Sequence, residues 1–137
     1  MILFTPGDVD ILARTIYGEA EGESRQGKIA VAHTVLNRVK DGVRWSRVVA
    51  AVCLQPRQYS CWNNESRRVH ILLTVTDRSD GIFKECRDLA LGTLSGSYPD
   101  PTNGANHYFN PSIVLPKWAA GMQKISVIGN HRFGFIP

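Results

Sequence analysis

The chain has 137 residues, of which 43% are hydrophobic and 20% are charged. This size and composition fit one globular domain with one core and argue against a disordered chain. The net charge of +4 favours an anionic partner, but the basic residues form no run that would predict nucleic-acid binding. The longest apolar run after the N-terminus, VVAAVCL, is too short to span a membrane.

Two helices are predicted in the first third of the chain, and they meet at an acidic corner. Residues 6–20 carry apolar side chains at helical spacing, with Thr5 as the N-cap. Residues 25–40 form the second helix, with Ser24 as the N-cap and Gly42 at its end. Three carboxylates lie where the two helices meet: Glu19, Glu21 and Glu23.

The rest of the chain predicts shorter helices followed by a small sheet. Helices are expected over residues 46–54 and 80–94, whereas the run 69–75, VHILLTV, fits a helix or a strand. In residues 124–135, KISVIGNHRFGF, Gly129 and Asn130 separate two β-prone runs and predict a hairpin. The predicted fold class is therefore α+β, mainly helical with a small antiparallel sheet near the C-terminus.

Glu19 is the strongest candidate for chemistry. It falls at the edge of the apolar face, in the last turn of the first helix, where the helix dipole disfavours a negative charge. If loops close over it, desolvation also favours the protonated form. A protonated Glu can donate a proton to a leaving-group oxygen, as in glycoside cleavage. The alternative is a surface carboxylate at a helix end.

The two neighbouring carboxylates are weaker candidates for a catalytic role. Glu21 projects away from the apolar stripe of the first helix and is expected to be solvated. Glu23 precedes the second helix, where a carboxylate stabilises the positive helix N-terminus. A role for Glu23 as a second catalytic carboxylate is the alternative.

Two later loops, QPRQYSCWNNES and NGANHYFNP, have the composition of a sugar-binding cleft. Their rings offer apolar faces with polar edges, and their amides offer paired donors and acceptors. The candidate substrate-binding residues are Tyr17, Gln58, Tyr59, Trp62, Asn106, Tyr108 and Asn110. Aromatic packing in the core is the alternative for each ring, and His107 and His131 are further candidates to line the cleft.

The sequence carries no motif for a metal or a cofactor, and we expect neither. No pair of His residues has the H-E-x-x-H spacing, and there is no phosphate loop or dinucleotide fingerprint. Three cysteines lack C-x-x-C spacing, so neither a zinc site nor a disulfide framework is predicted. Free thiols are expected, with a bridge between Cys53 and Cys61 as the alternative.

Four blocks of the sequence resemble, in family order, the SleB and CwlJ type cell wall hydrolases. The blocks are LARTIYGEAEGES with GKIAVAHTVLNRV, then QPRQYSCW, DPTNGANHYFNP and IGNHRF. The resemblance implies a lysozyme-like fold related to lytic transglycosylases, with Glu19 of the Y-G-E-A block as catalytic acid and base. The chain departs from the pattern at His107, where a more apolar residue is expected, and in a longer stretch at residues 65–80.

The resemblance also implies an activity. Residues 1–137 would form one catalytic domain that cleaves peptidoglycan glycan strands between N-acetylmuramic acid and N-acetylglucosamine, as a lytic transglycosylase. Hydrolysis by a muramidase and a non-catalytic glycan-binding module are the alternatives. We expect a monomer that binds no nucleic acid and does not insert stably into membranes.

The start of the chain, MILFTPGDVD, lacks the pattern of a secretory signal. We therefore expect synthesis in the cytosol. The protein would then act on the cell wall after release, as a phage endolysin does, or on spore cortex.

Overall fold

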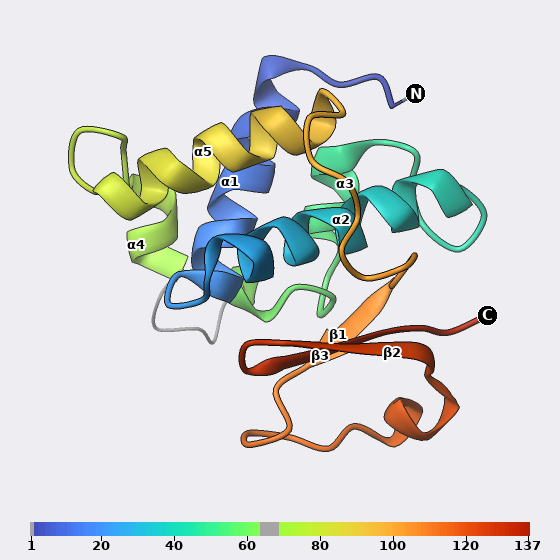
Figure 1. The fold of residues 1–137 in the computed structure, drawn as a ribbon. Coiled ribbons are helices and arrows are strands. Elements are labelled where there is room, and N and C mark those ends of the chain that lie inside the picture. The colour runs from blue at the N-terminus through green and yellow to red at the C-terminus, as the bar shows by residue number, and fades with distance from the viewer. Residues whose placement is uncertain (1, 64–68) are drawn as a thin grey trace.

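The computed structural model describes residues 2–63 and 69–137. Within these ranges, five α-helices come first and three strands follow (Figure 1). The helices are α1 (Pro6–Ala20), α2 (Arg25–Asp41), α3 (Val49–Leu54), α4 (Val69–Thr74) and α5 (Gly81–Leu94). The strands are β1 (His107–Phe109), β2 (Gln123–Ile128) and β3 (His131–Phe135), and the 3-10 turns are η1 (Ser60–Trp62) and η2 (Lys117–Gly121). The predicted α+β class is confirmed.

Local capping signals define the two long N-terminal helices as predicted. Thr5 and Asp8 form a capping box at the start of α1, in which each side chain accepts a hydrogen bond from the backbone N–H of the other residue. Ser24 caps α2 by accepting a hydrogen bond from the Gly27 N–H at 3.1 Å. Helix α2 ends where Gly42 takes a left-handed conformation with φ of 62°.

One short helix begins later than predicted, and the structure decides the type of another segment that the sequence left open. Helix α3 begins at Val49, three residues later than predicted. The Ser46 hydroxyl accepts a hydrogen bond from the Val48 N–H at 3.0 Å, so it closes a turn before the helix starts. The run 69–75, which fits either a helix or a strand, contains the helix α4.

Helix α5 is predicted correctly in extent, and its buried face differs from the expected one only at its first turn. Asp80 caps it by accepting hydrogen bonds from the N–H groups of Ile82 and Phe83. The apolar spacing puts Ile82, Cys86, Leu89, Ala90 and Thr93 on one face. The last four are buried, whereas Ile82 is 42% exposed and Phe83 is buried at the start of the helix.

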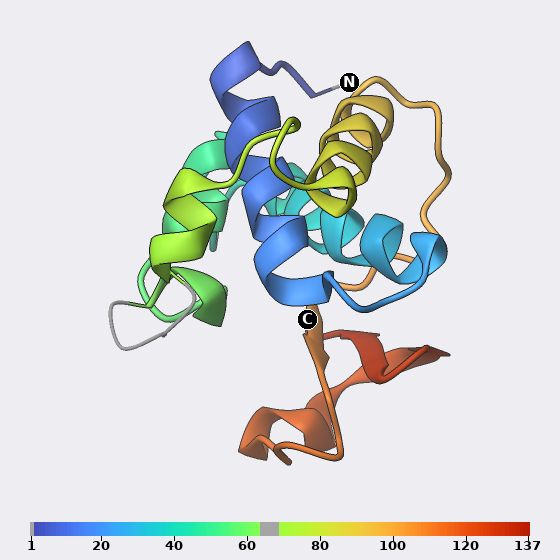
Figure 2. The same cartoon turned by 90° about the vertical axis from the view of Figure 1, so that its left-hand side faces the viewer.

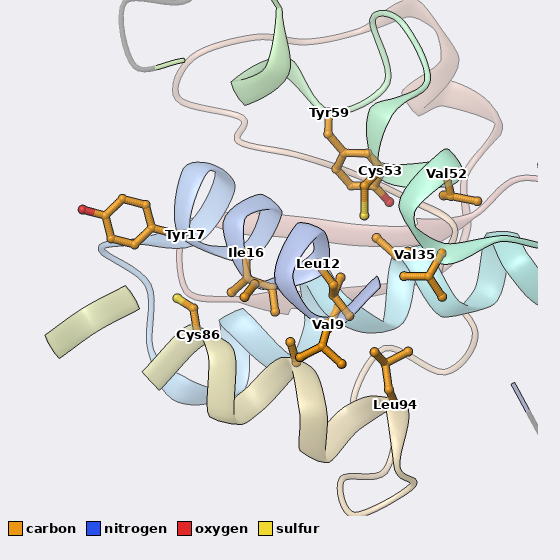
Figure 3. Close-up of a cluster of buried hydrophobic side chains, with 14 of the residues drawn as sticks. Val9, Leu12, Ile16, Tyr17, Val35, Val52, Cys53, Tyr59, Cys86 and Leu94 are labelled. Atoms are coloured by element: carbon orange, nitrogen blue, oxygen red, sulfur yellow. The ribbon is translucent and has the colours of Figure 1, made fainter. Parts of the chain in front are cut away.

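The main core lies between α1, α2, α3 and α5, with Leu12 and Ile16 at its centre (Figure 3). A smaller cluster joins the helices to the sheet through Ala20, Val31 and Phe133. The strands are antiparallel in the order β1-β3-β2. In the rotated view of Figure 2, the strands and η2 lie beside one end of the helical part. The three cysteines are buried and free. None of the described helices is long and apolar enough to cross a membrane.

Tyr59 belongs to this core, and its predicted place in the cleft is wrong. Its ring is 1% exposed and points into the cluster beside Cys53 (Figure 3). Its hydroxyl shares a 3.0 Å hydrogen bond with the Thr34 hydroxyl, which itself donates to the Val31 carbonyl. A loop position alone does not expose a ring when the loop packs across helices.

Tyr59→Ala should therefore destabilise the fold. Loss of a buried ring costs about 3 to 5 kcal/mol, which would lower the melting midpoint by roughly 10 °C or more in a domain of this size. Tyr59→Phe keeps the ring and loses one hydrogen bond, so its cost should be about 1 kcal/mol. Thermal unfolding of the two variants checks both values. A melting midpoint for Tyr59→Ala close to that of the parent would mean that the ring is not part of the core and lines the cleft instead.

Candidate active site

A cleft of about 1020 Å³ runs between the α1–α2 corner and the sheet. This volume is at the upper end for small-ligand pockets. Residues from distant parts of the sequence line it together, including Glu19, Glu21, Glu23, Gln58, Ser60, His107, Tyr108, Asn110, Trp118 and His131.

Glu19 lies in the last turn of α1, half-buried at the side of the cleft. One carboxyl oxygen, Oε2, accepts a hydrogen bond from the Cys61 N–H at 3.0 Å and a longer one from the Ser60 hydroxyl at 3.3 Å. The other oxygen, Oε1, accepts a short hydrogen bond from the Tyr108 hydroxyl. Donors from two separate segments thus fix the orientation of the carboxyl group.

The approach of η1 to Glu19 depends on Gly18. A Cβ atom at this position would lie 2.5 Å from the Cβ and 2.8 Å from the Sγ of Cys61, closer than carbon and sulfur atoms can pack. Glycine is therefore required for η1 to come near enough to α1 for its backbone to reach Glu19.

Tyr108 connects Glu19 to the sheet. It sits in β1, half-buried, with its ring centroid 5.3 Å from that of Phe133 and 5.1 Å from that of His131. Burial, and then the nearby Glu19 carboxylate, raise the pKa of the Tyr108 phenol well above its ordinary value. The phenol therefore keeps its proton and acts as a hydrogen-bond donor to Glu19.

Glu23 also lines the cleft, but its carboxylate does not cap α2 as predicted. Its two oxygens accept hydrogen bonds from the backbone N–H of Asn130 at 3.0 Å and from the Asn130 side chain at 2.8 Å. Burial opposes the charged form, but these hydrogen bonds and the charges of His131 and Lys28 outweigh it and lower the pKa of the Glu23 carboxyl. Glu23 is thus an ionised contact to the β2–β3 turn.

His107 lines the cleft, as expected, and behaves as an aromatic residue. Its ring lies 4.9 Å from Trp118 and 6.0 Å from Trp45, measured between centroids. Burial, followed by repulsion from Arg38 and Arg44, lowers the pKa of His107 to about 4. A neutral imidazole between two indoles fits a position where the family resemblance implies an apolar residue.

Three further candidates for substrate binding form hydrogen bonds within the fold instead. The Tyr17 hydroxyl donates to Asp80 at 2.7 Å, and its ring is buried. The Trp62 Nε1 donates to the Thr15 hydroxyl at 2.9 Å. The Asn106 side chain exchanges hydrogen bonds with the backbone of Ile136 at 3.0 and 2.8 Å. None of the three is among the residues that line the cleft, because each polar group is satisfied inside the fold.

Gln58 and Asn110 do lie in the cleft, as predicted. The Gln58 Oε1 accepts a hydrogen bond from Arg38 at 3.1 Å, and the guanidinium of Arg38 also donates to the Asn106 carbonyl at 2.8 Å. The Asn110 Oδ1 accepts hydrogen bonds from the N–H and hydroxyl of Ser112. Both amides are thus held in place by protein partners and present their remaining polar atoms to the cleft.

Sequence analysis missed Ser60 and Trp118. Ser60 lies in the block QPRQYSCW, where a serine between aromatic residues has no spacing that would single it out. Trp118 lies in η2, in a segment without a periodic pattern, so no local signal assigns it to a cleft.

Gly18→Ala should disrupt the site. Because the added methyl group overlaps Cys61, η1 must move away from α1, and we expect a reaction that depends on Glu19 to slow by about tenfold or more as its donors shift. An activity assay beside a melting curve measures the effect. Gly81→Ala is the matched control, since a Cβ atom there meets nothing within 4 Å. Equal activity in the two variants would mean that the contact between η1 and Glu19 is unimportant.

His107 should make stability depend on pH. The unfolded chain binds a proton near the ordinary histidine pKa of 6.5, whereas the folded chain binds it only near pH 4. The unfolded state therefore holds more protons between these values, so the free energy of unfolding rises with pH across this window and the contribution is lost as pH falls. Denaturant unfolding from pH 4 to 7 should show a shallower rise for His107→Leu. Identical slopes would contradict the lowered pKa.

Comparison with known proteins agrees with this architecture. Residues 22–134 match the family described as Cell Wall Hydrolase. Over 130 residues the chain is 30% identical to the spore cortex-lytic enzyme of Bacillus cereus, covering 95% of this chain and 45% of that protein. Over 135 residues it is 31% identical to the spore cortex-lytic enzyme of Bacillus subtilis, covering 95% of this chain and 38% of that protein.

Two solved structures have the same fold. The catalytic domain of the Bacillus cereus SleB protein is 28% identical with a TM-score of 0.76, covering 96% of this chain and 92% of that one. The catalytic domain of the germination-specific lytic transglycosylase SleB from Bacillus anthracis is 28% identical with a TM-score of 0.73, covering 96% of each chain. The chain thus spans less than half of the spore cortex-lytic enzymes but nearly all of these catalytic domains. Since the family match extends over most of its length, the chain belongs to the cell wall hydrolase family.

Proposed function

We propose that the chain is a peptidoglycan-cleaving catalytic domain, which acts as a lytic transglycosylase on the bond between N-acetylmuramic acid and N-acetylglucosamine. The observation that carries the proposal is the half-buried Glu19, held by donors from η1 and β1 at the side of the cleft. The names of the related catalytic domain and of the spore cortex-lytic enzymes support the same substrate class. Spore cortex and other peptidoglycan walls are the proposed places of action.

The proposed reaction uses Glu19 twice. Its carboxyl group first protonates the glycosidic oxygen, and the bond from this oxygen to the muramyl C1 breaks, so that the N-acetylglucosamine side leaves as an alcohol. The resulting carboxylate then takes the proton from the muramyl C6 hydroxyl while that oxygen bonds to C1 and closes an anhydro ring. The N-acetyl group of the substrate stabilises the positive charge at C1 between these steps.

The surroundings of Glu19 support both steps. The hydrogen bonds from Tyr108 and Cys61 stabilise the carboxylate that remains after Glu19 has given up its proton. The same donors hold the carboxyl group in one orientation, so that little reorganisation is needed between donating and accepting a proton.

Hydrolysis by a muramidase is the rival outcome, because Glu21 and Glu23 line the same cleft as Glu19. A second carboxylate that activates water would produce a reducing sugar end in place of the anhydro ring. Mass spectrometry of the released muropeptides separates the two reactions, since hydrolysis leaves each new end one water heavier.

Glu19→Gln should abolish cleavage while keeping the fold. The amide is nearly isosteric with the carboxyl group but has no proton to transfer, so wall lysis should fall by about 10² to 10⁴-fold. The melting midpoint should stay within a few degrees of the parent value. Asp88→Asn is the control, because it removes a carboxylate from an exposed ion pair with Lys84 on α5, outside the cleft-lining set.

Turbidity of purified cell walls, followed together with a melting curve, provides the measurement. A folded Glu19→Gln protein that clears walls as fast as the parent would show that another group is the acid. A parent protein that binds walls without releasing any fragment would instead identify a glycan-binding module.

A further inference from the structure

We propose that Glu23 is a positioning residue: it anchors the β2–β3 turn to the α1–α2 corner and so holds Tyr108 where it donates to Glu19. The inference rests on the proposed function of Glu19, and it assigns the second carboxylate of the cleft a role other than proton transfer to the substrate.

The anchor joins residues that are far apart in the chain. The Glu23 carboxylate accepts both the backbone N–H and the side-chain N–H of Asn130, at 3.0 and 2.8 Å. Its side chain is only 9% exposed although it lies at a helix–helix corner. A carboxylate that accepts two hydrogen bonds from one asparagine defines the position and the direction of the turn that carries it.

Gly129 shows how closely the turn approaches the corner. It has a φ of 59°, and a Cβ atom there would lie 2.5 Å from the Glu23 Oε1. A side chain at this position would therefore be strained by its backbone conformation and would also collide with the carboxylate. The close contact between the β2–β3 turn and the α1–α2 corner therefore depends on a glycine at position 129.

A short chain of packed rings leads from the anchor to Glu19. His131 directly follows Asn130, and its ring lies edge-on to Tyr108 with centroids 5.1 Å apart. Phe133, further along β3, is the direct strand partner of Tyr108 and packs against its ring at 5.3 Å. Because the phenol of Tyr108 donates to Glu19, a displacement of the turn would be transmitted through these rings to the catalytic carboxyl group.

The occupied oxygens of Glu23 favour positioning over direct catalysis. Oε1 accepts the Asn130 N–H and lies 3.6 Å from the His131 Nδ1, while Oε2 accepts the Asn130 side chain. A general base must direct an oxygen at the water it activates. The bonds to the turn fix the direction of both oxygens, so a water activated by Glu23 would have to lie on the lone pairs that these bonds leave free.

A charge exchange tests the anchor. Glu23→Ala removes it, whereas Glu23→Gln keeps it only if the Asn130 amide turns over to present its oxygen. In the double variant Glu23→Gln with Asn130→Asp, the amide at position 23 can donate to the carboxylate at position 130 and still accept the backbone N–H. This variant restores the anchor while moving the negative charge to the other side of it.

We expect kcat on soluble glycan strands to fall by about tenfold for Glu23→Ala, since a misplaced Tyr108 misaligns Glu19. The double variant should recover to within about threefold of the parent, with the pH profile of kcat unchanged in shape and the anhydro products retained. Tyrosine ring ¹³C resonances give a readout independent of activity: the Tyr108 signals should shift in Glu23→Ala and return in the double variant.

Several outcomes would overturn the inference. A double variant as inactive as Glu23→Ala would mean that Glu23 itself acts on the substrate. The loss of one limb of the pH profile of kcat in the double variant would mean the same. Unshifted Tyr108 resonances in Glu23→Ala would remove the link to the anchor even if the parent proved inactive. An inactive parent would reject the proposed function alone. Asp77→Asn, which breaks an ion pair with Arg87, controls for the loss of a surface carboxylate.

Discussion

The contact between the end of α1 and the turn η1 is the constraint on which the site depends. Gly18 has no side chain, so the backbone of Cys61 can approach α1 and donate to Glu19. The same approach brings the Ser60 hydroxyl to the carboxyl group. A helix end alone would leave Glu19 free to turn into solvent. The close packing of a second backbone segment converts it into a fixed group at the side of a cleft.

The sheet completes the site from the opposite side. It is attached to the helices by the apolar contact of Phe133 with Val31 and by polar contacts at its ends. At one end Glu23 holds the β2–β3 turn through Asn130. Near the other, the buried Arg38 donates to the carbonyl of Asn106, just before β1. Since β1 carries Tyr108, these attachments set the width of the cleft as well as the orientation of Glu19.

Charge is distributed unevenly along the cleft. Carboxylates gather at the α1–α2 corner, where Glu23 is held ionised by its partners. Around His107, the positive charges of Arg38 and Arg44 and the burial of the ring keep the imidazole neutral. The cleft therefore combines an acidic corner with an aromatic wall, whose rings offer apolar faces to a ligand.

Local signals in the sequence were sufficient for the framework. The capping residues Thr5 and Ser24, the periodicity of residues 6–20 and the hairpin at residues 124–135 predict elements that the structure contains. The place of Glu19 at the edge of the buried face follows from the same helical periodicity. Each of these features is decided by residues within a few positions of one another, so the sequence predicts them reliably.

Only the tertiary structure decided which side chains form the cleft. Tyr59 and Tyr108 both follow turn-rich segments with similar neighbours, yet the first is buried beneath the helices and the second faces Glu19. The partner of Glu23 lies on a hairpin at the far end of the chain, and no local rule selects it over a capping role. The sequence by itself determined the helices, the hairpin and the position of Glu19 at the end of α1. The hydrogen-bond partners of Glu19 depended on long-range packing, because burial and hydrogen bonding are set by segments that meet only in the folded chain.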